Sequence, residues 1–197
     1  MASANTDKPS LRRQLLSVRA LLSSEDVESA AAVLAERAVA LPELARAHTV
    51  AAYVSVGREP GTRPLLDALR ERGVRVLLPV LLADNDLDWG VYRGAQSLVP
   101  AGRGLLEPDG ARLGVHAVLE ADTVLLPGLA VDGRGMRLGR GGGSYDRVLA
   151  RLARAEAHPA LVVLLYGNEV VARVPEEPHD HPVHTVVTPE GIRRFGG

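Results

Sequence analysis

The chain has 197 residues, 46% of them hydrophobic, and a formal net charge of -1 at pH 7. This composition predicts one compact domain over residues 1–197, and it argues against a disordered chain and against bulk attraction to nucleic acid. The absence of cysteine excludes disulfides, thiolate catalysis and cysteine-ligated zinc. Because the N-terminus is polar and no run is apolar enough to span a bilayer, we expect a cytoplasmic protein without a membrane partner.

Two helices are predicted at the N-terminal end of the chain. Leu11, Leu15, Val18 and Leu22 recur at helical spacing and indicate the apolar face of the first helix. The second helix is expected to start after Ser24, where acidic residues favour a first helical turn.

Strand patterns follow, separated by helical patterns. Between the first two strands, Thr62 is a plausible N-cap of a helix that ends at Gly73. The predicted strands cover residues 48–55, 74–78, 86–92, 123–126, 161–166 and 185–188. This order favours a single-domain, three-layer α/β/α fold with a mostly parallel open sheet. Ligands in such sheets collect at the carboxyl ends of the strands.

The most informative segment follows the buried strand pattern at 123–126 and reads PGLAVDGRGMRLGRGGGSYDR. Its glycines allow positive φ angles and close backbone approach, and Arg134, Arg137 and Arg140 supply planar cationic groups. A helix that begins at about Ser144 would direct its positive end toward a bound anion. The segment therefore predicts a phosphate-binding loop, with a flexible surface loop as the alternative.

Two widespread phosphate-binding motifs do not fit this segment. A P-loop requires a lysine beside its last glycine, and residues 135–144 contain none. The dinucleotide motif requires a third glycine where Ser144 stands.

Other short motifs are dispersed along the chain in a fixed order. Lys8 and Arg12 form a K-x-x-x-R pattern on the first helix, and YVSVGREPGT occupies residues 53–62. A GxxEP motif occupies residues 104–108, and an HDxxVxxVVT pattern occupies residues 179–188. Together with the arginine- and glycine-rich segment, these motifs resemble those of the 5-formyltetrahydrofolate cyclo-ligase family, also called 5,10-methenyltetrahydrofolate synthetase, over nearly the whole chain.

The resemblance implies an ATP- and magnesium-dependent ligase. Such an enzyme would convert 5-formyltetrahydrofolate to 5,10-methenyltetrahydrofolate through a phosphorylated formyl intermediate, with release of ADP and phosphate. Its cofactor would be Mg²⁺, its co-substrate ATP, and its partners small molecules alone. We expect a monomer that does not bind nucleic acid.

The resemblance also implies the site residues. Lys8 and Arg12 would contact the ATP phosphates, and Lys8 and Arg140 are the candidate catalytic residues. The remaining ATP-binding residues would be Arg137, Leu138, Gly139, Arg140, Gly141, Gly142, Gly143, Ser144 and Tyr145. The folate-binding residues would be Val54, Glu59, Arg140, Gly141, Gly142, Gly143 and Ser144. Asp146 and Asp180 match the magnesium ligands, a suitable type because Mg²⁺ prefers carboxylate and phosphate oxygens.

Local sequence alone leaves simpler interpretations open. Lys8 and Arg12 could form the solvated face of an amphipathic helix, and Glu59 could be a surface charge in a turn. Asp146 would be favoured by the dipole of its own helix without any metal. The remaining alternative is a transition-metal site in the segment HDHPVH, formed by His179, Asp180, His181 and His184.

One departure from the family pattern bears on function. Ser144 stands where the family has the first tyrosine of a pair, and only 3% of the residues are aromatic. We therefore expect weaker folate binding or an altered substrate preference. A non-catalytic relative that binds nucleotide or folate, and a sugar-phosphate enzyme on a similar sheet, remain alternative functions.

Overall fold

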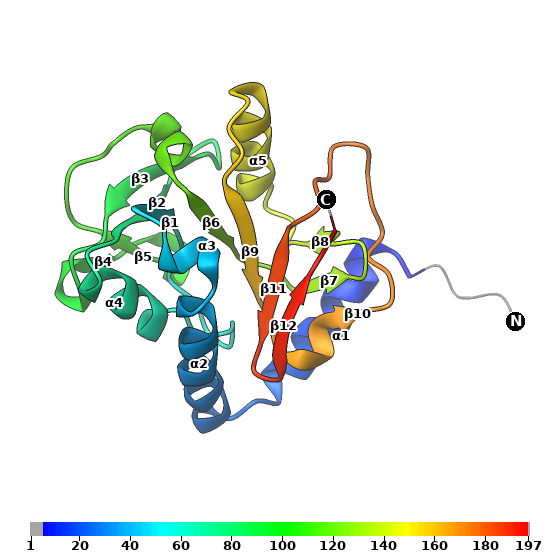
Figure 1. Ribbon diagram of the computed structural model, residues 1–197. Coiled ribbons are helices and arrows are strands. Elements are labelled where there is room, and N and C mark those ends of the chain that lie inside the picture. The colour runs from blue at the N-terminus through cyan, green and yellow to red at the C-terminus, as the bar shows by residue number, and fades with distance from the viewer. Residues whose placement is uncertain (1–5, 197) are drawn as a thin grey trace, which may run out of the picture.

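The computed structural model describes residues 6–196 and confirms the expected fold class. A mostly parallel central sheet is flanked by helices (Figure 1). The predicted domain boundaries at Met1 and Gly197, and part of the polar N-terminal segment, lie outside the described residues. No helix within residues 6–196 combines the length and the hydropathy that a membrane span requires.

The central sheet has seven strands in the order β12-β11-β9-β6-β1-β2-β3. Its inner neighbours pair in parallel, whereas β3 and β12 pair antiparallel at the two edges. The strands are β1 (Thr49–Ala51), β2 (Arg75–Leu81), β3 (Leu87–Val91), β6 (Thr123–Leu126), β9 (Ala160–Leu164), β11 (Thr185–Thr188) and β12 (Gly191–Arg194). The edge strand β12 was not predicted from the sequence.

Helices cover both faces of this sheet. One face packs against α2 (Ser24–Val39), α3 (Pro42–Ala45) and α4 (Arg63–Glu71). The other face packs against α5 (Ser144–Arg154) and the 3-10 segment Val115–Glu120. Because successive strand residues point to opposite faces, Val50 lies in the first core and Ala51 in the second.

A second, small sheet lies beside the central one and was not predicted. It has the order β10-β7-β8, and α1 (Lys8–Ala20) lies next to it (Figure 1). Its strands are β7 (Ala130–Asp132), β8 (Arg137–Leu138) and β10 (Val170–Val171). A separate hairpin is formed by β4 (Leu98–Pro100) and β5 (Leu106–Pro108). The segment that was predicted to be one loop therefore contains the β7–β8 hairpin.

The buried face of α1 differs from the predicted one. Leu11 and Leu15 are buried as expected, but Val18 is 41% exposed and Arg19 is only 3% exposed. Arg19 Nε donates to Glu169 Oε1 over 2.6 Å, and Arg19 NH2 donates to the carbonyl of Gly128 over 2.8 Å. The charge of Arg19 is thus paired inside the protein, and it ties α1 to the segments that follow β6 and β9.

The first strand is shorter than its predicted range of 48–55. After β1 the chain continues without regular structure to a turn at Gly57 and Arg58, and the stretch before this turn is held in place by Thr62. Its hydroxyl donates to the Tyr53 carbonyl over 2.8 Å and accepts from the Ser55 amide over 2.9 Å. Thr62 does occupy the N-cap position of α4, but its side chain does not cap the helix.

Candidate active site

A cavity of about 350 Å³ opens where the strand order changes direction. From β1 the chain continues to β2 on one side, while β6 lies on the other side of β1. Ligands of open α/β sheets bind at such a switch point, outside the carboxyl ends of the strands. The cavity brings together all the predicted site residues: Lys8, Arg12, Val54, Glu59, Arg137, Leu138, Gly139, Arg140, Gly141, Gly142, Gly143, Ser144, Tyr145, Asp146 and Asp180.

The glycine-rich loop between β8 and α5 forms one wall of the cavity. Gly141 has a φ of +98°, and Gly143 at the start of α5 has a φ of +78°, which L side chains rarely adopt. A Cβ added to Gly141 would lie 3.3 Å from the guanidinium carbon of Arg12. Arg12 Nε donates to the Gly139 carbonyl over 2.8 Å. The absence of side chains therefore lets Arg12 approach the loop backbone.

Two residues of the predicted phosphate loop do not belong to it. Arg134 and Gly135 lie in the β7–β8 turn and do not line the cavity. Arg134 instead forms ion pairs with Asp132 and Glu176, both at 2.8 Å. The prediction that Arg134 helps to hold phosphate is wrong because its charge is already paired elsewhere.

Arg137 is a buried cation with incomplete pairing. Its side chain is 7% exposed, and its NH1 donates to the Pro127 carbonyl over 2.8 Å. The nearest carboxylate oxygen, on the half-exposed Asp146, is 3.5 Å from NH2. Nε has no hydrogen-bond partner among the described residues, and burial lowers the pKa of the guanidinium. An underpaired cation beside a cavity favours a bound anion.

Glu59 is a buried carboxylate that lines the cavity close to Arg140. It is 8% exposed, and one carboxylate oxygen accepts from the Val56 amide over 2.7 Å. The other oxygen lies 3.6 Å from Arg140 Nε, and the side chain of Arg140 is half exposed. The interpretation of Glu59 as a surface charge is therefore wrong, since it faces the cavity from a buried position.

Two tyrosines contribute hydroxyl groups to this region. Burial raises the pKa of Tyr145 and of Tyr53, and the neighbouring Glu59 raises both further. The Tyr145 hydroxyl is buried and has no hydrogen-bond partner within residues 6–196. Both groups are neutral donors at physiological pH. Tyr53 was missed as a site residue because a tyrosine after a buried strand has no distinctive sequence signal.

Lys8 connects α1 to the segment between β10 and β11. Its Nζ lies 2.7 Å from Asp180 Oδ2 and 2.8 Å from Glu177 Oε2. Burial alone would lower the pKa of Lys8, but the two carboxylates outweigh it and raise that pKa. Burial likewise opposes ionisation of Asp180, yet the hydrogen bond from Lys8 lowers the pKa of this carboxyl. The paired, partly buried Lys8 is therefore not a solvated helix position.

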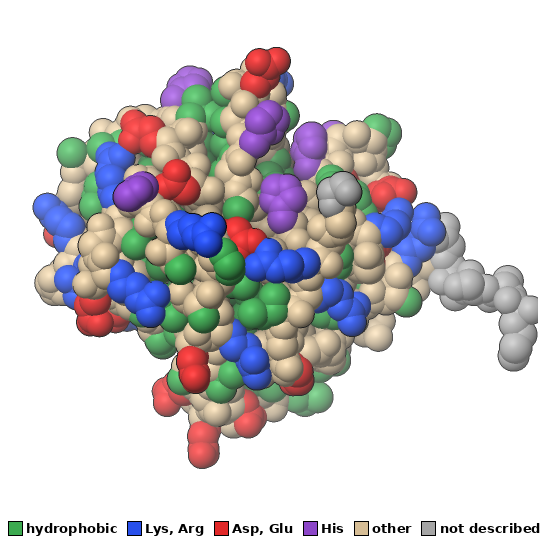
Figure 2. All heavy atoms as spheres, in the orientation of Figure 1, with side chains coloured by type: hydrophobic (Ala, Val, Ile, Leu, Met, Phe, Trp, Pro, Cys, Tyr) green, Lys and Arg blue, Asp and Glu red, His purple; other side chains and the backbone are tan. Residues whose placement is uncertain are grey.

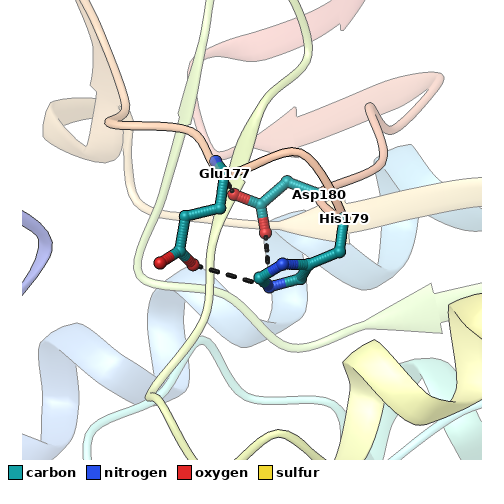
Figure 3. Close-up of side chains that lie close together, drawn as sticks. All are labelled: Glu177, His179 and Asp180. Carbon is teal, nitrogen blue, oxygen red and sulfur yellow. Dashed lines mark hydrogen bonds and ion pairs between the residues drawn. The ribbon is translucent and has the colours of Figure 1, made fainter.

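The predicted transition-metal cluster is only partly assembled. Glu177, His179 and Asp180 point toward one another, with ligand atoms within 4.8 Å (Figure 3). The ammonium of Lys8 already pairs with both carboxylates of this group. His184 is engaged elsewhere, because its Nδ1 accepts from the Leu161 amide over 2.8 Å. The four-residue HDHPVH site is thus not formed, although Asp180 keeps its place on the cavity wall.

A further wall of the cavity was not predicted from the sequence. It comes from β2, β3 and the β4–β5 hairpin, and is apolar except for Asn85 and Arg103. Its apolar members are Pro79, Leu81, Leu87, Leu105 and Leu106. Of these residues, Leu87 alone lies in a predicted strand range, and only tertiary packing brings the five together at the site. A planar apolar group can lie against such a surface.

Comparisons with known proteins identify the family of this chain. A sequence model of the 5-formyltetrahydrofolate cyclo-ligase family matches residues 4–189. A 5-formyltetrahydrofolate cyclo-ligase of Mycolicibacterium smegmatis is 46% identical over 149 residues, which are 72% of this chain and 74% of the relative. The Escherichia coli K12 protein of the same name is 34% identical over 179 residues, which are 88% and 96% of the two chains.

Solved structures show the same fold. The 5,10-methenyltetrahydrofolate synthetase of Aquifex aeolicus superposes with a TM-score of 0.81 at 28% identity, covering 96% of this chain and 93% of the other. A Mycoplasma pneumoniae synthetase of that name gives a TM-score of 0.72 at 20% identity, with 93% and 99% covered, a likeness of fold alone. With the family match and the residues gathered in the cavity, these comparisons show that the chain belongs to the 5-formyltetrahydrofolate cyclo-ligase family.

Proposed function

We propose that this cavity binds ATP, Mg²⁺ and 5-formyltetrahydrofolate and produces 5,10-methenyltetrahydrofolate, ADP and phosphate. The observation that carries the proposal is the convergence of two unlike groups on one cavity. Arg12, Arg137 and Arg140 line the cavity beside or within the glycine-rich loop, while the buried Glu59 faces the same space from the segment after β1. An anion and a polar heterocycle can therefore bind side by side.

The phosphate side of the site is formed by α1, β8 and the loop before α5. Arg137 is an underpaired cation, and the N-terminal amides of α5 begin at Ser144 beside it. Amides at a helix N-terminus and guanidinium groups both stabilise phosphate oxygens. We assign the triphosphate to these groups, with Lys8 and Arg140 nearest the transferred phosphoryl group. Lys8 would then divide its charge between the phosphate and Asp180.

The folate side is formed by the segment after β1 and by the apolar wall. A carboxylate such as Glu59 can accept two hydrogen bonds from neighbouring N–H groups of a reduced pterin. Val54 belongs to the same segment after β1, lines the cavity and is buried. Ser144 takes the place of a tyrosine ring here, so the apolar contact must come from other residues. This loss of aromatic surface supports the expected weaker folate binding.

The reaction transfers one phosphoryl group and forms one C–N bond. The formyl oxygen attacks the γ-phosphorus of ATP, the bond to the bridging oxygen breaks, and ADP leaves. The second folate nitrogen then attacks the activated formyl carbon, loses its proton, and phosphate departs with the former formyl oxygen. Phosphoryl transfer depends mainly on positioning and on neutralising spread negative charge, which the arginines of this cavity supply.

The donor set fits magnesium. Asp146 and Asp180 both line the cavity, and Mg²⁺ is held in nucleotide sites by one or two carboxylates together with phosphate oxygens and waters. Bound there, the ion would neutralise phosphate charge. Asp146 is half exposed, and its one ion pair, to Arg137 NH2, is long at 3.5 Å. Its carboxylate can therefore bind a cation without the loss of a strong ion pair.

We also propose that residues 1–197 form one domain and that the protein acts on small molecules as a cytoplasmic monomer. The family match over residues 4–189 supports one unit. Basic and acidic side chains are interspersed on the face shown in Figure 2, which does not favour a polyanionic partner.

An assay of the purified protein tests the proposed function. With ATP, Mg²⁺ and 5-formyltetrahydrofolate present, the near-ultraviolet absorbance of the methenyl product should rise, and omission of any one component should abolish the rise. With ¹⁸O in the formyl group, the label should appear in the released phosphate. Binding of both substrates without turnover would identify a non-catalytic relative instead. Unlabelled phosphate would contradict the phosphorylated intermediate.

A further inference from the structure

Arg103 stands apart from the other cationic residues of the cavity. Lys8, Arg12, Arg137 and Arg140 all belong to α1 or to the segment that runs from β8 to α5. Arg103 lies in the turn of the β4–β5 hairpin, on the wall that is otherwise apolar. The cavity therefore carries positive charge on two of its walls, and the wall that carries Arg103 is otherwise apolar apart from Asn85.

The position of Arg103 is fixed by the backbone around it. Its φ of +62° is rare for a residue with a side chain and sets the direction of the hairpin turn. The hairpin is tied to the end of β2, because the Leu81 amide donates to Glu107 Oε1 over 3.0 Å. Arg103 NH1 donates to Asn85 Oδ1 over 3.2 Å. The guanidinium thus lines the cavity between the β4–β5 hairpin and the turn that joins β2 to β3.

The charge of Arg103 is not neutralised. Within residues 6–196 its hydrogen bond goes to a neutral amide, and no carboxylate forms an ion pair with it. The acidic neighbours of Asn85 are engaged by other residues. Asp84 lies 3.6 Å from Arg147, and Asp86 is 2.5 Å from Arg151. Arg103 consequently presents an exposed, unpaired cation to the mouth of the cavity.

We propose that Arg103 binds the glutamate carboxylate of the folate substrate. The inference rests on the proposed function and extends it to the far end of the ligand. A folate consists of a polar pterin, a flat aminobenzoyl ring and a glutamate. Glu59, the apolar wall and Arg103 offer complementary groups to these three parts, and guanidinium is well suited to carboxylate recognition. Arg103 therefore selects folates that carry an amino-acid tail.

Comparison of two substrates on matched variants tests this assignment. Arg103→Ala is assayed with 5-formyltetrahydrofolate and with 5-formyltetrahydropteroate, which lacks the glutamate. Arg93→Ala is the control, because Arg93 is also exposed and hydrogen-bonded but pairs with Asp109 away from the cavity. KM for each substrate, KM for ATP and kcat are measured, together with direct binding of both folates by calorimetry.

Arg103→Ala should raise the KM for 5-formyltetrahydrofolate about tenfold, as expected for the loss of one partly exposed charge-assisted hydrogen bond. The KM for ATP should stay within about twofold, and the pteroate should bind wild type and variant equally. An equal rise in KM for both folates, or no rise for either, would overturn the assignment. If the wild type binds folate without turnover, a tenfold weaker binding by Arg103→Ala still supports it while the proposed function fails. No folate binding by the wild type would overturn both.

Discussion

Loss of the buried guanidinium in Arg19→Met should strongly destabilise the protein. The side chains of Arg19 and Glu169 are 4% and 1% exposed, and two hydrogen bonds of 2.6 and 3.0 Å join them. Glu169 also accepts from the Tyr166 amide over 3.0 Å, so it cannot turn away to solvent without breaking that contact. Removal of Arg19 leaves a buried, uncompensated carboxylate.

The expected cost follows from this burial. Breaking a buried ion pair by removing one partner typically costs about 3–5 kcal/mol, a large share of the stability of a domain. Equilibrium unfolding in urea, followed by far-ultraviolet circular dichroism, should show a midpoint lower by about 2 M, given a typical m-value near 2 kcal/mol/M. The control is Arg13→Met, an exposed change on the same helix, and its free energy of unfolding should stay within about 0.5 kcal/mol of the wild-type value.

The double variant Arg19→Met with Glu169→Leu separates the charge from the packing. Replacement of both partners by apolar residues is often nearly neutral, so most of the lost stability should return. An Arg19→Met midpoint within about 0.3 M of wild type would refute the reasoning, because a buried unpaired carboxylate must lower stability by more than that. A double variant less stable than Arg19→Met would show that packing and the hydrogen bond from the Tyr166 amide to Glu169, and not the unpaired charge, set the cost.

Three further changes have defined outcomes. Gly135→Ala should lower the free energy of unfolding by about 2 kcal/mol or more, because the φ of Gly135 is +81° and the new Cβ would lie 2.6 Å from a backbone carbonyl oxygen. The control Gly133→Ala has open space around the new Cβ and should be near neutral in thermal unfolding. Lys8→Met should make the free energy of unfolding depend less on pH in the acid range. Burial alone would raise the pKa of Asp180, but the hydrogen bond from Lys8 outweighs it and lowers that pKa from 3.8. The Lys8–Asp180 pair therefore stabilises the wild type above pH 3.8, and this stabilisation is lost as the pH falls through the lowered pKa. Urea midpoints between pH 5 and about pH 2 measure the difference, and equal slopes for the two proteins would contradict it. Asp146→Asn should raise the Mg²⁺ concentration for half-maximal turnover about tenfold or more, while an unchanged requirement would remove Asp146 from the metal site.

Much of the fold and of the site follows from local patterns in the sequence. Buried strands such as β6 and β9 are short apolar runs between turn signals, so their positions were close to the observed ones. The predicted phosphate-binding loop combines glycines, arginines and a following helix within one continuous stretch. Residues such as Arg140 and Gly143 could therefore be assigned to the cavity without knowledge of the tertiary structure.

The features that were missed depend on contacts between distant segments. Val170 of β10 pairs with Val131 of β7, and neither strand is long enough to show a periodic pattern. Arg19 was not among the residues predicted for the buried face of the first helix, because hydrophobic periodicity cannot show that Glu169, far along the chain, compensates its charge. Arg103 reaches the cavity only because two hairpins pack together. Each of these features is set by a contact between segments that lie far apart in the sequence.

The most direct test of the central claim compares Arg140→Ala with Arg173→Ala in the methenyl-forming assay. Arg140 lines the cavity 3.6 Å from Glu59, whereas Arg173 is exposed and does not line the cavity. If the arginine loop neutralises the transferred phosphoryl group, Arg140→Ala should reduce kcat/KM by about three orders of magnitude, and Arg173→Ala should leave it within about twofold. Normal turnover by Arg140→Ala would contradict the claim that this loop holds the reacting phosphate.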